Sequence, residues 1–189
     1  MSASCESPLA WDSLIAYWCG DLNAGIEEQI EEHNLGCAHC SRRLEQIRDL
    51  AQGVRLLART SGVSMITSDA FVRRLAEEGL RVREYRVPLN GSVNCTIAPE
   101  DDFIVGHLEA PLAGMQRIDM LTLDGEGQVL QRQEDIPFAA ESGCVVVVPA
   151  VETIRAMPKT TMHLRLLAMD DMGEQVLGDY KFHHTPPQP

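Results

Sequence analysis

The sequence predicts an α+β protein in which a small helical domain precedes an antiparallel β-sandwich. The chain has 189 residues, 44% of them hydrophobic, which suits one or two compact domains. Apolar residues recur every three or four positions through the first third of the chain, and about every second position from residue 82 onward. We therefore expect a helical domain at 1–60, a linker and amphipathic helix at 61–81, and the sandwich at 82–189.

Two short helices are expected first. Asp12 can cap a helix that runs through Trp18, and Gly20 ends it. A second helix should begin near Asn23, with glutamates favourable near its positive end, and should carry His33 at its far end. Each has apolar residues on one face, so the two can pack as an antiparallel hairpin.

A longer third helix is the clearest single element, and it should end before Gly62. A linker at 60–67 follows, and Ser68 or Asp69 then caps an amphipathic helix that stops at Gly79. The third helix is predicted by a repeat of three or four residues at Leu44, Ile47, Leu50, Ala51, Val54, Leu57 and Ala58.

The remaining chain reads as short strands separated by turns, which is typical of a β-sandwich. Turns are expected at Asp124–Gly127 and Asp170–Gly173. The expected strands are Arg83–Val87, Ser92–Ile97, Phe103–Leu108, Arg117–Leu123, Val129–Arg132, Cys144–Pro149, Met162–Met169 and Gln175–His183.

Charge and composition narrow the classes of function. The 28 acidic and 16 basic residues give a formal net charge of -12, which disfavours direct nucleic-acid binding and favours basic partners. No basic N-terminal segment precedes an apolar core, and the longest apolar run, Val145–Val148, is too short to span a bilayer. We expect a soluble cytoplasmic protein, in which clustered cysteines hold metal or sense redox state more often than they form disulfides.

One stretch of eight residues holds an imidazole and two thiols, at His33, Cys37 and Cys40. Zinc binds Cys sulfur at about 2.3 Å and His nitrogen at about 2.0 to 2.1 Å, so its ligands must converge closely, as residues at this spacing can. The alternative is a pair of ordinary buried thiols beside a surface histidine. Three ligand-type residues so close together favour the metal.

A closed zinc site needs a fourth ligand, for which Cys5, Cys19, His39 and water are the candidates. In a helical hairpin His33 lies beside the start of the first helix, which favours Cys5. Cys19 lies at the opposite pole, about 15 Å away at 1.5 Å of helix rise per residue. His39, inside the turn between the two cysteines, should point away. The predicted ligands are thus His33, Cys37, Cys40 and Cys5, with the other candidates left open.

The motif resembles that of the zinc-containing anti-sigma factors of bacteria over about residues 5–58. It consists of His33-x-x-x-Cys37-x-x-Cys40, preceded by the segment Leu14–Leu22 and an acidic helix. The resemblance implies a helical domain that holds zinc through this motif and an N-terminal Cys or His. Such a domain would bind an extracytoplasmic-function sigma factor and keep it from RNA polymerase, which represses transcription. Many of these regulators continue into a membrane helix, whereas here a β-rich sensor or scaffold domain is expected.

Two roles of the metal stay open. Zinc-bound thiolates can be oxidised to a disulfide, which would release the ion and loosen the domain, so a redox-responsive regulator is one hypothesis. A permanently structural zinc is the other. Cys95 and Cys144 are most simply core residues. No catalytic motif stands out and four protein ligands leave zinc no open position, so we predict that the protein is not an enzyme and has no catalytic residues.

Surface chemistry is consistent with a protein partner. Four glutamates, at 27, 28, 31 and 32, form an acidic face, and the apolar stripe of the third helix exceeds what the two short helices can cover. The alternative is a solvated acidic face and a stripe that packs on the sandwich. The rival function is a zinc-stabilised adaptor or ligand-binding protein whose sandwich carries the main function and whose helices form a homodimer.

Overall fold

The computed structural model of the chain describes residues 5–60, 64–170 and 173–186, and it confirms the α+β class. The chain divides into two compact units, Met1–Leu57 and Ala58–Pro189, which are described separately here. Among the described residues, no helix combines the length and the apolar character needed to cross a membrane.

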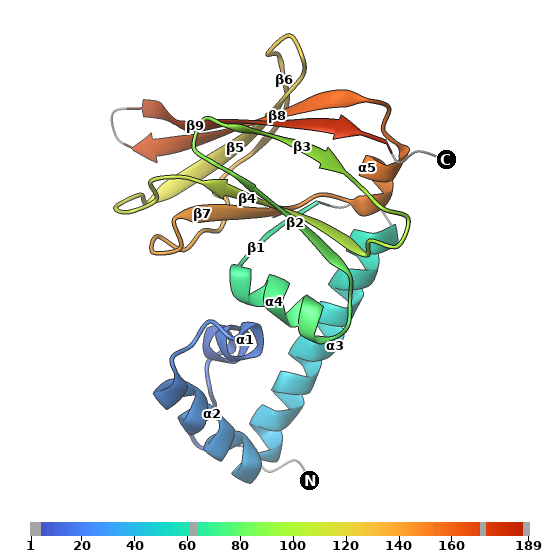
Figure 1. The fold of residues 1–189 in the computed structure, drawn as a ribbon. Helices are drawn as coiled ribbons and strands as arrows, with labels where there is room; N and C mark the ends of the chain where they lie inside the picture. The colour runs from blue at the N-terminus through green and yellow to red at the C-terminus, as the bar shows by residue number, and fades with distance from the viewer. Residues whose placement is uncertain (1–4, 61–63, 171–172, 187–189) are drawn as a thin grey trace. The chain divides into compact units, whose positions relative to one another are not determined.

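Unit 1 is built from α1 (Trp11–Cys19), α2 (Ala24–Gly36) and most of α3 (Ala38–Thr60) (Figure 1). The expected Asp12 cap is wrong: the N-cap position of α1 is Ala10, and Asp12 lies in the first helical turn. Gly20 ends α1 as expected, with a φ of 76° that favours glycine. The buried apolar side chains of this unit are Leu14, Trp18, Ile30, Cys40 and Ile47.

The starts of α2 and α3 differ in how closely they follow the sequence signals. The Asn23 side chain caps α2 by accepting a hydrogen bond from the backbone N–H of Ile26 at 3.1 Å. In contrast, α3 begins at Ala38, six residues before the apolar repeat that predicted it, so that Cys40 lies inside the helix. The side chains expected to continue the repeat at Val54, Leu57 and Ala58 lie outside the described residues.

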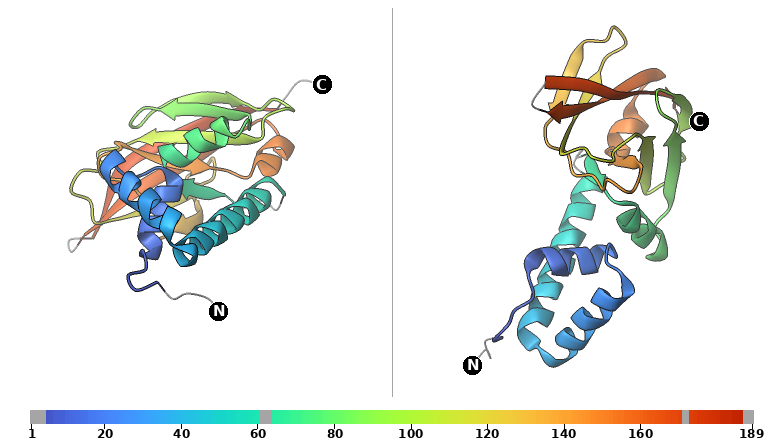
Figure 2. Two further views of the ribbon diagram at one scale, coloured as in Figure 1. Left: turned by 90° about the horizontal axis from the view of Figure 1, so that it is seen from below. Right: turned by 90° about the vertical axis from the view of Figure 1, so that its left-hand side faces the viewer.

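Unit 2 contains two β-sheets, seen from two directions in Figure 2. The first sheet has the order β1 (Met65–Thr67), β7 (Cys144–Val148), β4 (Phe103–Glu109), β2 (Val82–Val87). The second has the order β3 (Ser92–Thr96), β9 (Gly173–Thr185), β8 (Thr160–Asp170), β5 (Arg117–Leu123), β6 (Val129–Gln133). Residues 171–172, in the turn predicted between β8 and β9, lie outside the described residues.

The sheets are mixed, so the prediction of a purely antiparallel arrangement is wrong. β2 pairs with β4 in parallel, and β3 pairs with β9 in parallel. The reason is that β3 belongs to the other sheet, although it lies between β2 and β4 in the chain. A strand that leaves for the second sheet and returns brings β4 back in the direction of β2, which no hairpin could do.

One hydrophobic core draws residues from both sheets. The buried hydroxyl of Tyr180 on β9 donates a hydrogen bond of 2.7 Å to the carbonyl of Glu109 at the end of β4. At Gly106 a Cβ atom would lie 3.0 Å from side-chain atoms of Phe182 and Val147, so a larger residue there would require these side chains to shift. The core includes Val87, Leu108, Val145 and Val147 from the first sheet and Ile118, Met120, Leu166, Tyr180 and Phe182 from the second.

Three short elements complete unit 2. Ser68 caps α4 (Asp69–Glu77) by accepting a hydrogen bond from the N–H of Phe71, in agreement with the amphipathic helix expected there. β1 lies within the segment expected to be a linker, of which residues 61–63 are outside the described residues. The helix α5 (Val151–Ala156) was not predicted either, because segments this short carry little periodicity.

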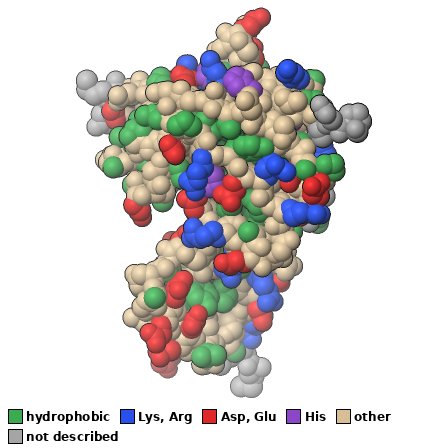
Figure 3. All heavy atoms as spheres, in the orientation of Figure 1, with side chains coloured by type: hydrophobic (Ala, Val, Ile, Leu, Met, Phe, Trp, Pro, Cys, Tyr) green, Lys and Arg blue, Asp and Glu red, His purple; other side chains and the backbone are tan. Residues whose placement is uncertain are grey.

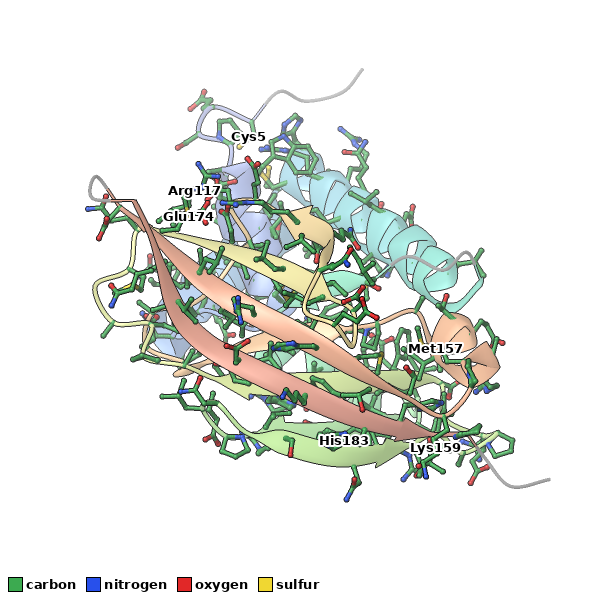
Figure 4. All side chains as sticks on the ribbon, turned by 90° about the horizontal axis from the view of Figure 1, so that it is seen from above. Cys5, Arg117, Met157, Lys159, Glu174 and His183 are labelled. Atoms are coloured by element: carbon green, nitrogen blue, oxygen red, sulfur yellow. The ribbon has the colours of Figure 1, made fainter. Side chains whose placement is uncertain are left out.

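An ion-pair network stabilises one end of the second sheet. The carboxylate of Asp119 on β5, fully buried, accepts hydrogen bonds from Arg117 at 3.1 Å and from Arg132 at 2.6 Å. Arg132 in turn pairs with Glu174 on β9 at 2.7 Å; Arg117 and Glu174 are labelled in Figure 4. The network thus links β5, β6 and β9.

Candidate metal centre

The structure brings Cys5, His33, Cys37 and Cys40 together in unit 1. One ligand atom from each lies within 4.8 Å of those of the other three, and the group could hold a metal ion. Cys40 is buried and the other three side chains are partly buried. Cys5, labelled in Figure 4, comes from the segment before α1, and the others come from the end of α2 and the start of α3.

The spacing between the ligand atoms is close to that of a tetrahedral site. The Sγ atom of Cys5 lies 3.6 Å from the Nε2 atom of His33. Tetrahedral bonds of about 2.3 Å to sulfur and about 2.05 Å to nitrogen would place such a pair about 3.5 Å apart. An ion could therefore bind between these two atoms with little movement of either side chain.

The junction between α2 and α3 holds three of these residues in place. His33 lies in the last turn of α2, and Cys37 follows its last residue. The hydroxyl of Ser41 donates to the carbonyl oxygens of Asn34 at 2.7 Å and Cys37 at 3.0 Å. Ser41 is in the first turn of α3, so its side chain links the end of α2 to the start of α3. These hydrogen bonds therefore hold the segment that carries the three ligands.

The N-terminal segment is held by a separate set of contacts. The backbone N–H of Leu9 donates to the Sγ atom of Cys40 at 3.4 Å, and the guanidinium of Arg43 donates to the carbonyl of Leu9. The same guanidinium stacks on the ring of Trp11, 4.2 Å from its centroid. These contacts fix the backbone four residues from Cys5, and they supply an N–H···S hydrogen bond of the kind that supports metal-bound thiolates.

The electrostatics of the cluster favour one thiolate in particular. Backbone N–H groups at the start of α3, that of Cys40 first, lower the pKa of Cys37 to about 6, against partial burial and with help from Cys5. The pKa of Cys5 is raised, by desolvation first and then by the neighbouring Cys37. The two adjacent thiols therefore do not ionise independently, and a bound cation would be needed to hold both of them as thiolates.

Of the three side chains considered for the fourth ligand, one lies in the group. Cys5 joins the group, whereas Cys19 and His39 are not members of it. Cys19 is the last residue of α1 and His33 lies in the last turn of α2, so most of α2, which has 13 residues and is about 20 Å long, separates them. The helical hairpin that the sequence argument assumed is consistent with the hydrogen bond from Tyr17 to Glu31, which shows α1 and α2 in contact.

Sequence reasoning did not find a second group of metal-capable side chains, in unit 2. It consists of Asp69, His107 and Cys144, whose ligand atoms also lie within 4.8 Å of one another. These residues are separated by more than 30 positions each, so no local spacing indicates them. Cys144 was expected to be a simple core residue, and only the pairing of β4 with β7 brings it near His107.

Unit 2 also contains a cavity of about 370 Å³ between its sheets. Buried His184 lies in its wall, and neither ring nitrogen has a hydrogen-bond partner among the described residues. Most of the wall is apolar, including Met65, Ile104, Met120, Met162, Leu164 and Phe182.

Comparisons with known proteins do not assign the chain to a family. No protein-family model matches it, and neither does a curated protein. Among solved structures it is similar to the N-terminal domain of phage TP901-1 ORF48, with a TM-score of 0.37, 10% identity, and coverage of 58% of this chain and 100% of that one. It is also similar to CopC from Methylosinus trichosporium OB3b, with a TM-score of 0.27, 14% identity, and coverage of 41% and 72%. Both scores are too low to support an argument about fold or function.

Proposed function

We propose that the protein is a zinc-binding anti-sigma factor that sequesters an extracytoplasmic-function sigma factor and so represses transcription. The observation that carries this proposal is the convergence of Cys5 with His33, Cys37 and Cys40. The resemblance to zinc-containing anti-sigma factors implies His33, Cys37 and Cys40 as ligands together with an N-terminal Cys or His, and Cys5 is an N-terminal cysteine. The resemblance rests on a motif, and the convergence is independent of it because Cys5 is 28 residues from His33.

Zinc is the ion that the donor set favours. Three thiols and one imidazole are soft and borderline ligands, which suit tetrahedral zinc and disfavour magnesium or calcium. Unit 1 buries only a few apolar side chains for its size, and small domains of this kind commonly need a metal or disulfides for stability. Four protein ligands would leave no coordination position for water, so the proposed role of the zinc is structural rather than catalytic.

The surface of unit 1 supports a protein partner. Acidic side chains gather over α2 in Figure 3, where Glu28, Glu31 and Glu32 are exposed. Unit 1 also exposes large apolar side chains: Leu35 is 90% exposed and Leu50 is 69% exposed. A sigma factor offers basic DNA-binding surfaces and apolar grooves between helices, so an acidic and partly apolar helical unit is complementary to it. The further exposed apolar residues of this unit are Trp11, Ile15, Ile26 and Leu56.

The role proposed for unit 2 is that of a sensor or scaffold, with its two sheets packed as a sandwich around their shared core. In this account the regulator acts in the cytoplasm, where the sigma factor meets RNA polymerase. Oxidation is one signal that the site could receive. Two zinc thiolates would give up two electrons to hydrogen peroxide, forming one disulfide and two water molecules with two protons and releasing the ion.

Co-expression tests the proposed function. The full chain is produced with the extracytoplasmic-function sigma factor encoded beside it, and both co-purification and transcription from a sigma-dependent promoter are measured. We expect a stable complex and repression, both lost in the variant Cys37→Ser/Cys40→Ser and both kept in the control Cys95→Ser. A folded, metal-loaded chain that neither retains nor represses any such sigma factor of its source organism would refute the proposal.

A second candidate function is favoured by the cavity of unit 2. In that account the protein binds an apolar small molecule between the sheets, and the zinc-stabilised helices serve as an adaptor. The apolar probe N-phenyl-1-naphthylamine should then bind with one site per chain, and Met120→Trp, which fills the cavity, should reduce that binding. Probe binding without a sigma factor complex would favour this candidate over the first.

A further inference from the structure

A cluster of chemically reactive side chains in unit 2 is independent of the candidate metal centre. Asp69 is the first residue of α4, His107 lies on β4 and Cys144 begins β7. The side chain of His107 is 1% exposed and Cys144 is buried, whereas Asp69 is 33% exposed. Three elements far apart in sequence therefore bring an oxygen, a nitrogen and a sulfur to one place at the edge of the core.

His107 lies between two carboxylates. Its Nε2 atom is 2.7 Å from Oε2 of Glu84 on β2, and its Nδ1 atom is 2.9 Å from Oδ1 of Asp69. The second carboxylate oxygen of Asp69 is 3.7 Å from Sγ of Cys144. The contact with Glu84 is a well-formed hydrogen bond, since it is short and correctly aligned.

The contact between His107 and Asp69 is not a hydrogen bond. Despite the short distance, the buried Nδ1 atom of His107 has no hydrogen-bond partner of acceptable geometry. A neutral imidazole carries one N–H group, and because the carboxylate of Glu84 can only accept, the hydrogen bond between them requires that N–H group to be at Nε2. The lone pair of Nδ1 then faces a carboxylate oxygen, which is repulsive unless a positive charge lies between them.

We propose that this cluster is a second zinc site, with a carboxylate oxygen of Asp69, Nδ1 of His107 and Sγ of Cys144 as ligands. One oxygen, one nitrogen and one sulfur form a donor set that zinc accepts readily, and the atoms already lie within 4.8 Å of one another. Glu84 completes the arrangement, because a metal-binding histidine usually donates its other ring N–H to a carboxylate.

Local charge is also consistent with a divalent cation. Arg86, opposite His107 in the pairing of β2 with β4, acts electrostatically on Cys144. The two charges of the ion, together with that of Arg86, would balance the carboxylates of Asp69 and Glu84 and the thiolate of Cys144. Three protein ligands would leave a fourth coordination position, which water or a small anion could occupy.

Metal titration of the full chain tests this site. The chelator-stripped, reduced protein is titrated with Zn²⁺, and with Co²⁺ as a spectroscopic substitute. If both zinc sites exist, the wild type binds two ions per chain, and Cys144→Ala and Asp69→Asn each bind one fewer. Asp69→Asn preserves the shape of a partly exposed side chain, so it tests the site even if Cys144→Ala does not fold. Glu84→Gln should weaken this binding about 10- to 100-fold.

Matched controls separate this site from the one in unit 1. Cys95→Ala removes a buried thiol of the other sheet and should leave the stoichiometry unchanged. Cys37→Ser/Cys40→Ser should still bind one ion through unit 2, whether or not the first proposal is correct. Equal stoichiometry in the wild type, Asp69→Asn and Cys144→Ala would overturn the proposal, and would mean that a proton rather than a metal ion lies between His107 and Asp69.

Discussion

Replacing Cys5 by alanine tests the N-terminal metal centre without removing any helix. Cys5 lies before α1, and its sulfur is 3.6 Å from His33. Structural zinc sites bind with about 10 to 16 kcal/mol, so one of four ligands accounts for about 2.5 to 4 kcal/mol. This corresponds to a loss of about 10²- to 10³-fold in zinc affinity.

The matched control is Cys19→Ala, which removes a partly buried cysteine of the same unit that is not a member of the cluster. Zinc affinity is measured by competition with a chromophoric chelator, and helicity is followed by circular dichroism at each zinc concentration. We expect Cys19→Ala to bind zinc as the wild type does and Cys5→Ala to need much higher zinc to retain its helices. Equal affinity in Cys5→Ala and the wild type, or an equal loss in Cys19→Ala, would refute the assignment of Cys5 as a ligand.

Further predictions concern stability and oxidation. Burial raises the pKa of Asp119, but hydrogen bonds from the N–H of Asp135 and from Arg132 and Arg117 outweigh burial, so folding lowers this pKa. Folding lowers the pKa of Asp101 in the same way, with Arg83 as the main side-chain partner. The stability that these carboxylates contribute is fully present above their unfolded pKa of about 3.9, and it is lost as the pH falls below that value. The Tm of unit 2 should therefore drop steeply between about pH 4 and pH 2, and not between pH 7 and pH 5. Asp119→Ala should lower the free energy of unfolding by about 1 to 3 kcal/mol in urea titrations, because the N–H of Asp135 loses its acceptor and two partly exposed arginines each lose one partner. A change below about 0.5 kcal/mol would contradict the role of the network. Gly106→Ala should destabilise unit 2 by about 1 to 3 kcal/mol in the same assay, since the new methyl group meets side chains at 3.0 Å, and an unchanged midpoint would show that the core can relax. Hydrogen peroxide should release zinc from the N-terminal centre with formation of one disulfide, as measured by a zinc-sensitive dye and mass spectrometry. Retention of the zinc in peroxide would contradict the redox role and indicate that the ion is purely structural.

Local patterns predicted the elements well. Asn23 and Ser68 form the caps that their positions indicated, and the apolar period identified each helix of unit 1. The strand boundaries differ from the predicted ones by only a few residues, because apolar and polar residues alternate along a strand that buries one face. Cys5 could be ranked above Cys19 because the length of the second helix, which is predictable from the local sequence, sets the distance from Cys19 to His33.

Features that depend on distant pairings were not predictable in this way. The parallel pairing of β2 with β4 depends on β3 joining the other sheet, and alternation within a strand carries no information about its neighbours. The juxtaposition of His107 and Cys144 depends in turn on the register of β4 with β7. A motif search finds ligands a few residues apart, and it does not find ligands that only the sheet brings together.

The metal content of the purified chain tests the central claim most directly. Elemental analysis of the reduced protein, together with native mass spectrometry, measures zinc per chain in the wild type and in Cys37→Ser/Cys40→Ser. The account predicts that the double variant holds one zinc ion fewer than the wild type and loses the helical structure of unit 1. A wild type that is free of zinc and keeps its helices in strong chelator would contradict it, as would equal zinc content in the two proteins.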